Sequence, residues 1–437
     1  MDTTPSERHR IVIVGGGAGG LELATKLGDR LGRRGRADIV LVDAEPTHLW
    51  KPLLHEVAAG TLNSYQDELN YIAHARGHHF RYRFGRMSGL DRVRKNIILA
   101  PVLDDDGREA VPSVPIPYDT LIIAVGSVSN DFNTPGAREF CQFLDDRVEA
   151  ERLHRDLLIG VLAAVAGPRA AGVLDVAIIG GGATGVELAA ELRSMGEELS
   201  KYGVPIDPDA LRITVIEAAP RVLPVLPERL GTSVADALRG IGVRILAGAR
   251  VAQIDERAVH LADGTEVPAQ IKVWAAGIKA PDFLRNIDGL ESNRAGQLVV
   301  RRTLQTTRDD DVFAFGDCAA CPQPGTDQPV PARAQAAHQQ ASMLAKSMVR
   351  RLDGKPLPEY TYRDFGSLVS LSRYTALGTI MGGVFRHSHR IEGRIARFAY
   401  ISLYRMHQMA LHGLWRTAIL ILTNRLQRVT QPSLKMH

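Results

Sequence analysis

Cysteine is scarce in this chain of 437 residues, which contains only three. So few cysteines exclude a disulfide framework and indicate a reducing compartment. Cys318 and Cys321 form a Cys-x-x-Cys pair, and Cys141 stands alone. A metal or redox role is one interpretation of such a pair. Because no companion ligands accompany it, we favour two small buried residues and predict no metal site.

Aromatic residues make up only 5% of the chain, which gives little sign of surfaces that stack on bases, so we expect no nucleic-acid partner. No run of 18 uncharged apolar residues is present, and this argues against a membrane-spanning helix. Met1 to His9 is short and polar, without the apolar core of a signal peptide.

Positive charge is concentrated at the C-terminus. From Arg386 to His437 there are eight arginines and one lysine against one glutamate, so this segment carries +8 in a chain whose net charge is +4. The remaining residues are therefore net acidic. This asymmetry indicates a partner that is specific to the tail.

A glycine turn near the N-terminus organises the first part of the chain. Ile11 to Val14 is a run of β-branched residues typical of a buried parallel strand. Gly15, Gly17 and Gly20 follow with the spacing of a dinucleotide-binding turn, and we predict a helix from about Leu21 to Leu31. Asp43 ends the next strand, where a carboxylate can bind the hydroxyls of a ribose.

The same device occurs a second time. A strand runs from Asp175 to Gly180, and Gly180, Gly182 and Gly185 repeat the spacing before a helix predicted from about Val186 to Leu199. Glu217 ends the matching second strand. Two complete fingerprints indicate two dinucleotides, and the natural pair is a resident flavin with a visiting nicotinamide.

Four further positions are candidates for cofactor contacts. Lys51 lies in a mixed segment, 47–60, just after the ribose-binding acid, where a flavin ring would extend. Gly126 and Gly277 each end a buried strand in a turn of small residues, the second at a place where a nicotinamide could lie flat. Asp317 follows another strand and can bind a flavin's polyol linker, or begin the next helix as its N-cap.

Several segments together resemble one family. The two fingerprints, Gly316-Asp317, the Trp50–Ala58 segment and the helix with Gln335 and Gln339 resemble the type II NADH dehydrogenases, the single-chain NADH:quinone oxidoreductases, of proteobacterial respiratory type. The resemblance implies a hydride transfer from NADH to FAD and then two electrons to a membrane quinone, ubiquinone or menaquinone, without proton pumping.

The same resemblance implies roles for single residues. FAD would be held by Gly15, Gly17, Gly20, Asp43 and Asp317, and NADH by Gly180, Gly182, Gly185 and Glu217. Gln335 and Gln339 would border the quinone head group. Glu187 resembles a carboxylate near the flavin and the quinone path, although an acid in the first turn of a helix is also favoured by the helix dipole.

Three other classes compete with this interpretation. A pyridine-nucleotide disulfide reductase and a sulfide:quinone reductase both need cysteines close to the flavin, and Cys318-Ala-Ala-Cys321 follows the late Gly-Asp motif instead. A nucleotide-sensing protein that docks on membranes without catalysis would share the fingerprints. Bound FAD in the purified protein distinguishes the enzyme from the sensor.

The predicted fold is α/β, with two Rossmann-like dinucleotide domains of the glutathione-reductase type. Residues 1–172 and 289–345 are predicted to form the FAD domain and residues 173–288 the NADH domain, with an inserted hairpin at 99–117 and a crossover helix at about 147–166. Residues 346–437 are predicted to form a C-terminal region with amphipathic membrane-binding helices.

The tail has the pattern of an interfacial helix. From Phe398 to Leu426 apolar residues recur at helical spacing, and arginines interrupt them too often for a membrane span. We therefore expect a peripheral protein on the cytoplasmic face of the cell inner membrane, bound to an anionic surface. The alternative is a helix pair that packs on the protein's own body or on a second subunit, so a homodimer stays open.

Overall fold

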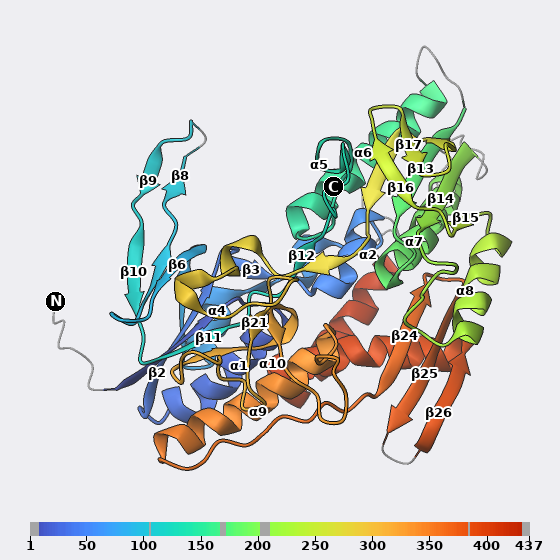
Figure 1. Ribbon diagram of the computed structural model, residues 1–437. Coiled ribbons are helices and arrows are strands. Elements are labelled where there is room, and N and C mark those ends of the chain that lie inside the picture. Colours follow the sequence, from blue (N-terminus) through green and yellow to red (C-terminus); the bar gives the residue numbers. More distant parts are fainter. Residues whose placement is uncertain (1–7, 105, 167–171, 202–209, 383–384, 431–437) are drawn as a thin grey trace. The chain divides into compact units, whose positions relative to one another are not determined.

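A computed structural model describes residues 8–104, 106–166, 172–201, 210–382 and 385–430 (Figure 1). The chain divides into two compact units. Unit 1 takes in residues 1–50, 68–128 and 279–364, and unit 2 takes in residues 51–67, 129–278 and 365–437. Each unit therefore draws on three separate stretches of the chain. The predicted domain boundaries at 172, 288 and 345 are not tested by this division and stay predictions.

A parallel sheet forms the core of unit 1. Its five strands lie in the order β22-β11-β1-β2-β5, and every neighbouring pair is parallel. The strands are β1 (His9–Val14), β2 (Ala37–Asp43), β5 (Arg81–Phe84), β11 (Thr120–Ile123) and β22 (Val312–Ala314). The side chains of Ile11 to Val14 are at most 3% exposed, as expected for a strand covered on both faces.

The first predicted helix of unit 1 begins earlier than expected. Helix α1 (Ala18–Leu27) starts directly after Gly17, which is its N-cap, and a single π-helical turn (Gly28–Gly32) follows it. Helix α9 (Ala334–Leu352) packs along α1. Glu22 of α1 accepts hydrogen bonds from His338 and Ser342 of α9, so a buried polar contact fixes the pair.

Unit 1 also contains a small antiparallel sheet, a hairpin and a short helix. The predicted hairpin at 99–117 is confirmed as antiparallel strands β8 (Val102–Leu103) and β9 (Glu109–Val111), which extend from the sheet β10-β7-β6. That sheet comprises β6 (Met87–Asp91), β7 (Asn96–Leu99) and β10 (Val114–Pro117). Helix α4 (Tyr71–Gly77) leads into β5.

Unit 2 repeats the parallel design. Its four-stranded sheet has the order β15-β14-β13-β19 and only parallel pairs. The strands are β13 (Leu174–Ile179), β14 (Leu211–Glu217), β15 (Arg244–Ala247) and β19 (Ile271–Trp274). Helix α7 (Ala183–Lys201) follows β13 and is longer at both ends than the predicted 186–199, whereas α6 (Arg147–Ala166) matches the predicted crossover helix.

Smaller elements of unit 2 pack around this sheet. An antiparallel sheet of β16 (Val251–Ile254), β17 (Ala258–Leu261) and β18 (Glu266–Pro268) adds to its core. Helix α8 (Glu228–Gly240) precedes β15, and the short helix α2 (Leu54–Ala58) packs on α6 and α7.

The C-terminal region contains a sheet that the sequence did not predict. Strands β24 (Gly366–Leu371), β25 (Thr375–Gly382) and β26 (Phe385–Glu392) form an antiparallel sheet, and helix α10 (Gly393–Thr430) packs on it. Gly413 breaks α10 with a positive φ of 75°. Among the described helices, none combines the length and the apolar character needed to cross a bilayer.

Candidate active site

The glycine turn of unit 1 is shaped by two close backbone approaches. A Cβ atom on Gly15 would lie 2.4 Å from the carbonyl oxygen of Ala124, and one on Gly20 would lie 1.8 Å from the oxygen of Gly15. A Cβ on Gly17 would meet nothing within 4 Å. The outer glycines thus permit tight packing, and the middle one faces open space that a pyrophosphate can enter.

Asp43 connects the end of β2 to this turn. One carboxylate oxygen accepts a hydrogen bond from the backbone N–H of Gly16, and the other accepts one from Glu45 at 2.8 Å. Tyr71 donates to the carbonyl oxygen of Gly16 at 2.7 Å, and burial raises the pKa of Tyr71 well above its usual value. Hydrogen bonds within the protein therefore fix both the turn and its acid.

Unit 2 contains the same arrangement. A Cβ on Gly180 would lie 2.6 Å from the backbone of Ala275, and one on Gly185 would lie 2.0 Å from the oxygen of Gly180. A Cβ on Gly182 would again meet nothing within 4 Å. The carboxylate of Glu217 accepts hydrogen bonds from the backbone N–H groups of Gly181 and Ala219, at 2.6 and 2.7 Å.

Arg221 follows Glu217 closely and is the basic residue that could favour a phosphate there. Its guanidinium donates to the carbonyl oxygens of Leu223, Pro224 and Leu226 at 2.7–2.9 Å. These bonds hold the side chain within its own loop, so its guanidinium is engaged there and not by the carboxylate of Glu217.

Asp317 lies in a short helical turn (Gly316–Cys318) that follows β22 in unit 1. Ser127, which follows Gly126, donates a hydrogen bond to its carboxylate at 2.9 Å. The backbone N–H of Gly316 donates to the side chain of Gln340 at 2.8 Å, and Gln340 is 2% exposed. The sequence analysis missed Gln340, because nothing in the sequence separates it from its neighbour Gln339.

The remaining cofactor candidates lie in unit 2. A Cβ on Gly277 would lie 2.4 Å from the ring of Phe132, so that ring packs closely against this glycine. Lys51 is exposed and begins a short 3-10 helix (Lys51–Leu53) before α2. Unlike the other candidates for FAD, Lys51 belongs to unit 2.

The two glutamines predicted for the quinone site both bond to the segment that ends unit 1. Gln335 donates to the carboxylate of Asp364 at 3.3 Å. Gln339 donates to the backbone oxygen of Arg363 at 2.8 Å and accepts from its N–H at 3.1 Å. A side chain that bonds to both backbone groups of one residue positions that residue, which is more than a solvated surface glutamine does.

Glu187 is a buried acid of unit 2 with a raised pKa. It is 7% exposed on α7 and accepts a hydrogen bond from the backbone N–H of Ser370 at 3.0 Å. Burial raises its pKa to about 8, and the carboxylates of Glu56 and Glu191 act in the same direction, against the bond from Ser370. At pH 7 this side chain is mostly protonated and can donate a proton.

His55 of α2 is a neighbour of Glu187 that the sequence analysis missed. Its Nδ1 lies 3.8 Å from a carboxylate oxygen of Glu187, and it is 3% exposed. Burial lowers the pKa of His55 to about 4, so the imidazole is neutral at pH 7. The two groups therefore meet as neutral partners, and no ion pair forms.

The cysteine pair is inaccessible in unit 1. Cys318 and Cys321 are both 0% exposed and unpaired, and Cys318 donates to the backbone oxygen of Phe315 at 3.2 Å. Burial raises the pKa of each thiol to about 12. The thiolate that redox or metal chemistry requires is scarce at neutral pH, so the interpretation as small buried residues fits the structure.

Comparison with known proteins identifies the family. The profile of the pyridine nucleotide-disulphide oxidoreductases matches residues 9–341. A type II NADH:quinone oxidoreductase of Haemophilus influenzae is 45% identical over 98% of this chain and 99% of its own. The chain belongs to the type II NADH:quinone oxidoreductases. A relative of the same name from Staphylococcus aureus is 30% identical over 86% of this chain and 90% of its own.

Solved structures agree on the fold of this type II NADH:quinone oxidoreductase. NDH2 from Plasmodium falciparum in complex with NADH superposes with a TM-score of 0.82, at 17% identity, over 99% of this chain and all of that one. The predicted glutathione-reductase-like α/β class is confirmed. FAD and NADH are its cofactors, and both glycine turns have the open middle position that a dinucleotide phosphate needs.

Proposed function

We propose that this chain catalyses the oxidation of NADH by a membrane quinone, without proton pumping, with the nucleotides bound at the residues described above. When bound, FAD would supply the redox chemistry: it can accept a hydride from NADH and pass two electrons to the quinone. The repetition of one carboxylate-braced glycine turn in both units is the observation that carries the proposal.

We assign each cofactor to its own set of residues. FAD is held by Gly15, Gly17, Gly20, Asp43, Gly126 and Asp317, with Lys51 near its ring. NADH is held by Gly180, Gly182, Gly185, Glu217 and Gly277. The domain division follows: residues 1–172 and 289–345 serve FAD, residues 173–288 serve NADH, and residues 346–437 dock on the membrane.

Quinone reduction consumes two protons, and NADH delivers only one of them with its hydride. We assign the second proton to a path that includes Glu187, since a buried carboxyl with a pKa of about 8 keeps its proton at pH 7. Gln335 and Gln339 orient the quinone directly or through the segment that they hold, Arg363–Asp364.

Stopped-flow spectroscopy tests this function. NADH is expected to bleach the flavin absorbance of the purified enzyme, and a soluble quinone is expected to restore it. In Gln335→Leu the bleaching stays near the wild-type rate, whereas the recovery slows about tenfold, because an amide that orients the quinone is lost. Protein reconstituted with FAD that NADH fails to bleach refutes the function, and equal slowing of both phases assigns Gln335 a structural role.

Glu217 is expected to select NADH over NADPH. A 2′-phosphate near its carboxylate meets like charge, and the guanidinium of Arg221 is engaged in its own loop. We expect kcat/KM for NADH to exceed that for NADPH by about 100-fold, and Glu217→Gln to reduce this ratio about tenfold. Steady-state rates with both nucleotides measure this ratio. The control is Glu266→Gln, a change at an exposed glutamate, which should leave the ratio unchanged. A wild type equally efficient with NADPH contradicts the assignment.

We also propose that α10 docks the enzyme on an anionic membrane surface, on the cytoplasmic face. Its second half exposes large apolar side chains at helical spacing: Trp415 (83% exposed), Ile419 (61%), Leu422 (60%) and Leu426 (63%). Leu411 and Thr417, at most 3% exposed, face inward. A helix with one exposed apolar face and flanking arginines is typical of interfacial binding. A homodimer that covers this face is the alternative.

A further inference from the structure

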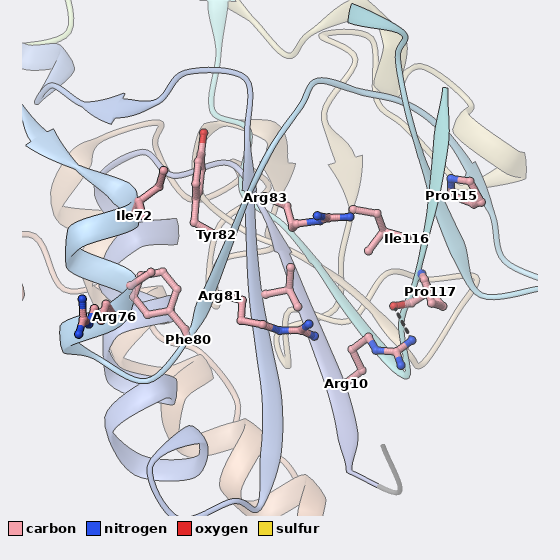
Figure 2. A pocket seen from close by; sticks show the side chains of 12 residues that line it. Arg10, Ile72, Arg76, Phe80, Arg81, Tyr82, Arg83, Pro115, Ile116 and Pro117 are labelled. Atoms are coloured by element: carbon pink, nitrogen blue, oxygen red, sulfur yellow. Dashed lines mark hydrogen bonds between the residues drawn. The ribbon is translucent and has the colours of Figure 1, made fainter. Parts of the chain in front are cut away.

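A hollow in unit 1 has a lining that none of the proposed cofactor or quinone residues shares. It encloses about 640 Å³ at the free edge of the parallel sheet, beside β5, between α4 and β10 (Figure 2). This volume lies in the range of small-molecule sites. We call it the arginine pocket, and its lining residues are Arg10, Val40, Ile72, Ala75, Arg76, Phe80, Arg81, Tyr82, Arg83, Pro115, Ile116 and Pro117.

Three of its four arginines gather on one side. Arg81 and Arg83 lie two residues apart on β5, and both side chains point away from α4, toward Ile116 and Pro117 (Figure 2). Arg10 approaches from β1. Because residues two apart on a strand share a face, the backbone fixes Arg81 and Arg83 on the same wall.

The positive charge of this wall is only partly neutralised. Arg81 donates through two nitrogens to the carboxylate of Asp38, and the guanidinium of Arg10 lies 4.0 Å from the same carboxylate. Within the described residues the side chain of Arg83 has no recorded hydrogen bond or ion pair. Two guanidiniums thus share the carboxylate of Asp38, and the guanidinium of Arg83 has no recorded acid partner, so positive charge is in excess on this wall.

Apart from Arg76 and the hydroxyl of Tyr82, the rest of the lining is apolar. Val40 is 3% exposed, Phe80 5% and Ile116 7%, so these side chains form a packed wall beside the guanidiniums. Arginine on an edge strand also discourages pairing with foreign strands. That role accounts for the charge of β5 but not for a hollow with an apolar wall.

We propose that the arginine pocket binds a small phosphate monoester with an apolar or aromatic body. A phosphate monoester carries nearly two negative charges at neutral pH and accepts bidentate bonds from guanidiniums, which matches the charge excess of this wall. Arg83 binds the phosphate together with Arg81, and the body of the ester lies against Val40 and Ile116. A soluble ester or the head group of a lipid both supply this chemistry.

Fluorescence titration of the full-length holoenzyme with 1-naphthyl phosphate tests the proposal, with NAD⁺ present at saturation to occupy the nucleotide site of unit 2. Saturable binding is expected, and Arg83→Ala is expected to weaken it about tenfold or more. Arg83 is exposed, so its loss spares the fold. The control is Arg108→Ala, an exposed arginine of the β8–β9 hairpin, which should bind as the wild type does.

Competition separates the contributions and the source of the ligand. Naphthalene methanol lacks the phosphate, and inorganic phosphate lacks the apolar body. Each should therefore displace the probe at least about tenfold less well than a non-fluorescent phosphate ester that has both parts. If adenosine monophosphate displaces the probe better, the natural ligand is a soluble ester. If dioctanoyl phosphatidic acid displaces it better, the ligand is a lipid head group. Absence of saturable binding, unchanged binding in Arg83→Ala, or equal competition by inorganic phosphate overturns the proposal.

Discussion

Glutamate at both Trp415 and Leu422 is expected to abolish binding of the enzyme to anionic vesicles. These side chains are 83% and 60% exposed, and burial of each in the interface contributes about 1.5–3 kcal/mol. Their joint loss, with two added negative charges, should weaken partitioning at least about 100-fold. Co-sedimentation with phosphatidylglycerol vesicles measures the binding. The activity of the variant with a lipid-embedded quinone should fall, while NADH should still reduce its bound FAD.

The matched control places the same charges on another exposed apolar pair. Ile159 and Leu162 of α6 are 57% and 59% exposed, and their replacement by glutamate should leave vesicle binding unchanged. Substitution is a cleaner test than removal of the tail would be, because the tail includes α10, which packs on β24 and β25. If the Trp415 and Leu422 double variant binds vesicles as well as the wild type does, the membrane assignment is contradicted. If the wild type is a dimer in analytical ultracentrifugation and this variant is not, the same face binds a second subunit.

Glu187→Gln is expected to slow the quinone step about 100-fold and to change hydride transfer less than about twofold. The amide keeps the acceptor for the N–H of Ser370 and removes the proton that Glu187 holds up to a pKa of about 8. The quinone step of the wild type should therefore decline above pH 8, and that of the variant should not. Stopped-flow reoxidation across pH 6–9 measures both.

The pH dependence of thermal stability tests the raised pKa of Glu187 independently. Because burial raises the pKa of Glu187 from 4.5 to about 8, the native state keeps a proton that the unfolded chain has already released between these values. Wild-type stability therefore falls with rising pH in this window, by up to about 1.4 kcal/mol per pH unit from this group. Glu187→Gln should gain melting temperature relative to wild type from pH 5 to pH 8, while the exposed Glu228→Gln should not. A constant difference contradicts the raised pKa.

Local patterns were sufficient to predict the two nucleotide turns. The spacing of Gly15, Gly17 and Gly20 reflects a steric demand that acts within a few residues, and the structure has the expected close approaches. The start of α1 at Ala18 was missed by three residues because Gly17, without a side chain to bond, still serves as the N-cap.

Features that depend on packing between distant segments could not be predicted. Gln339 and Gln340 are chemically identical neighbours, yet Gln339 bonds to Arg363 and Gln340 to Gly316. Only the rotation of α9 against α1 decides between these roles. Similarly, the partnership of His55 with Glu187 joins residues more than 100 positions apart, and β24–β26 lie in a region where helices alone were expected.

The interleaved segments of the two units have a consequence for biosynthesis. Strand β11 pairs with β22 through Leu121 and Val312, so one edge of the unit 1 sheet stays open until the ribosome has added nearly 200 further residues. At about 5–20 residues per second, that interval lasts about 10–40 seconds. A nascent chain with an exposed hydrophobic strand for so long is a candidate for chaperone protection, and truncations before Val312 should be prone to aggregation.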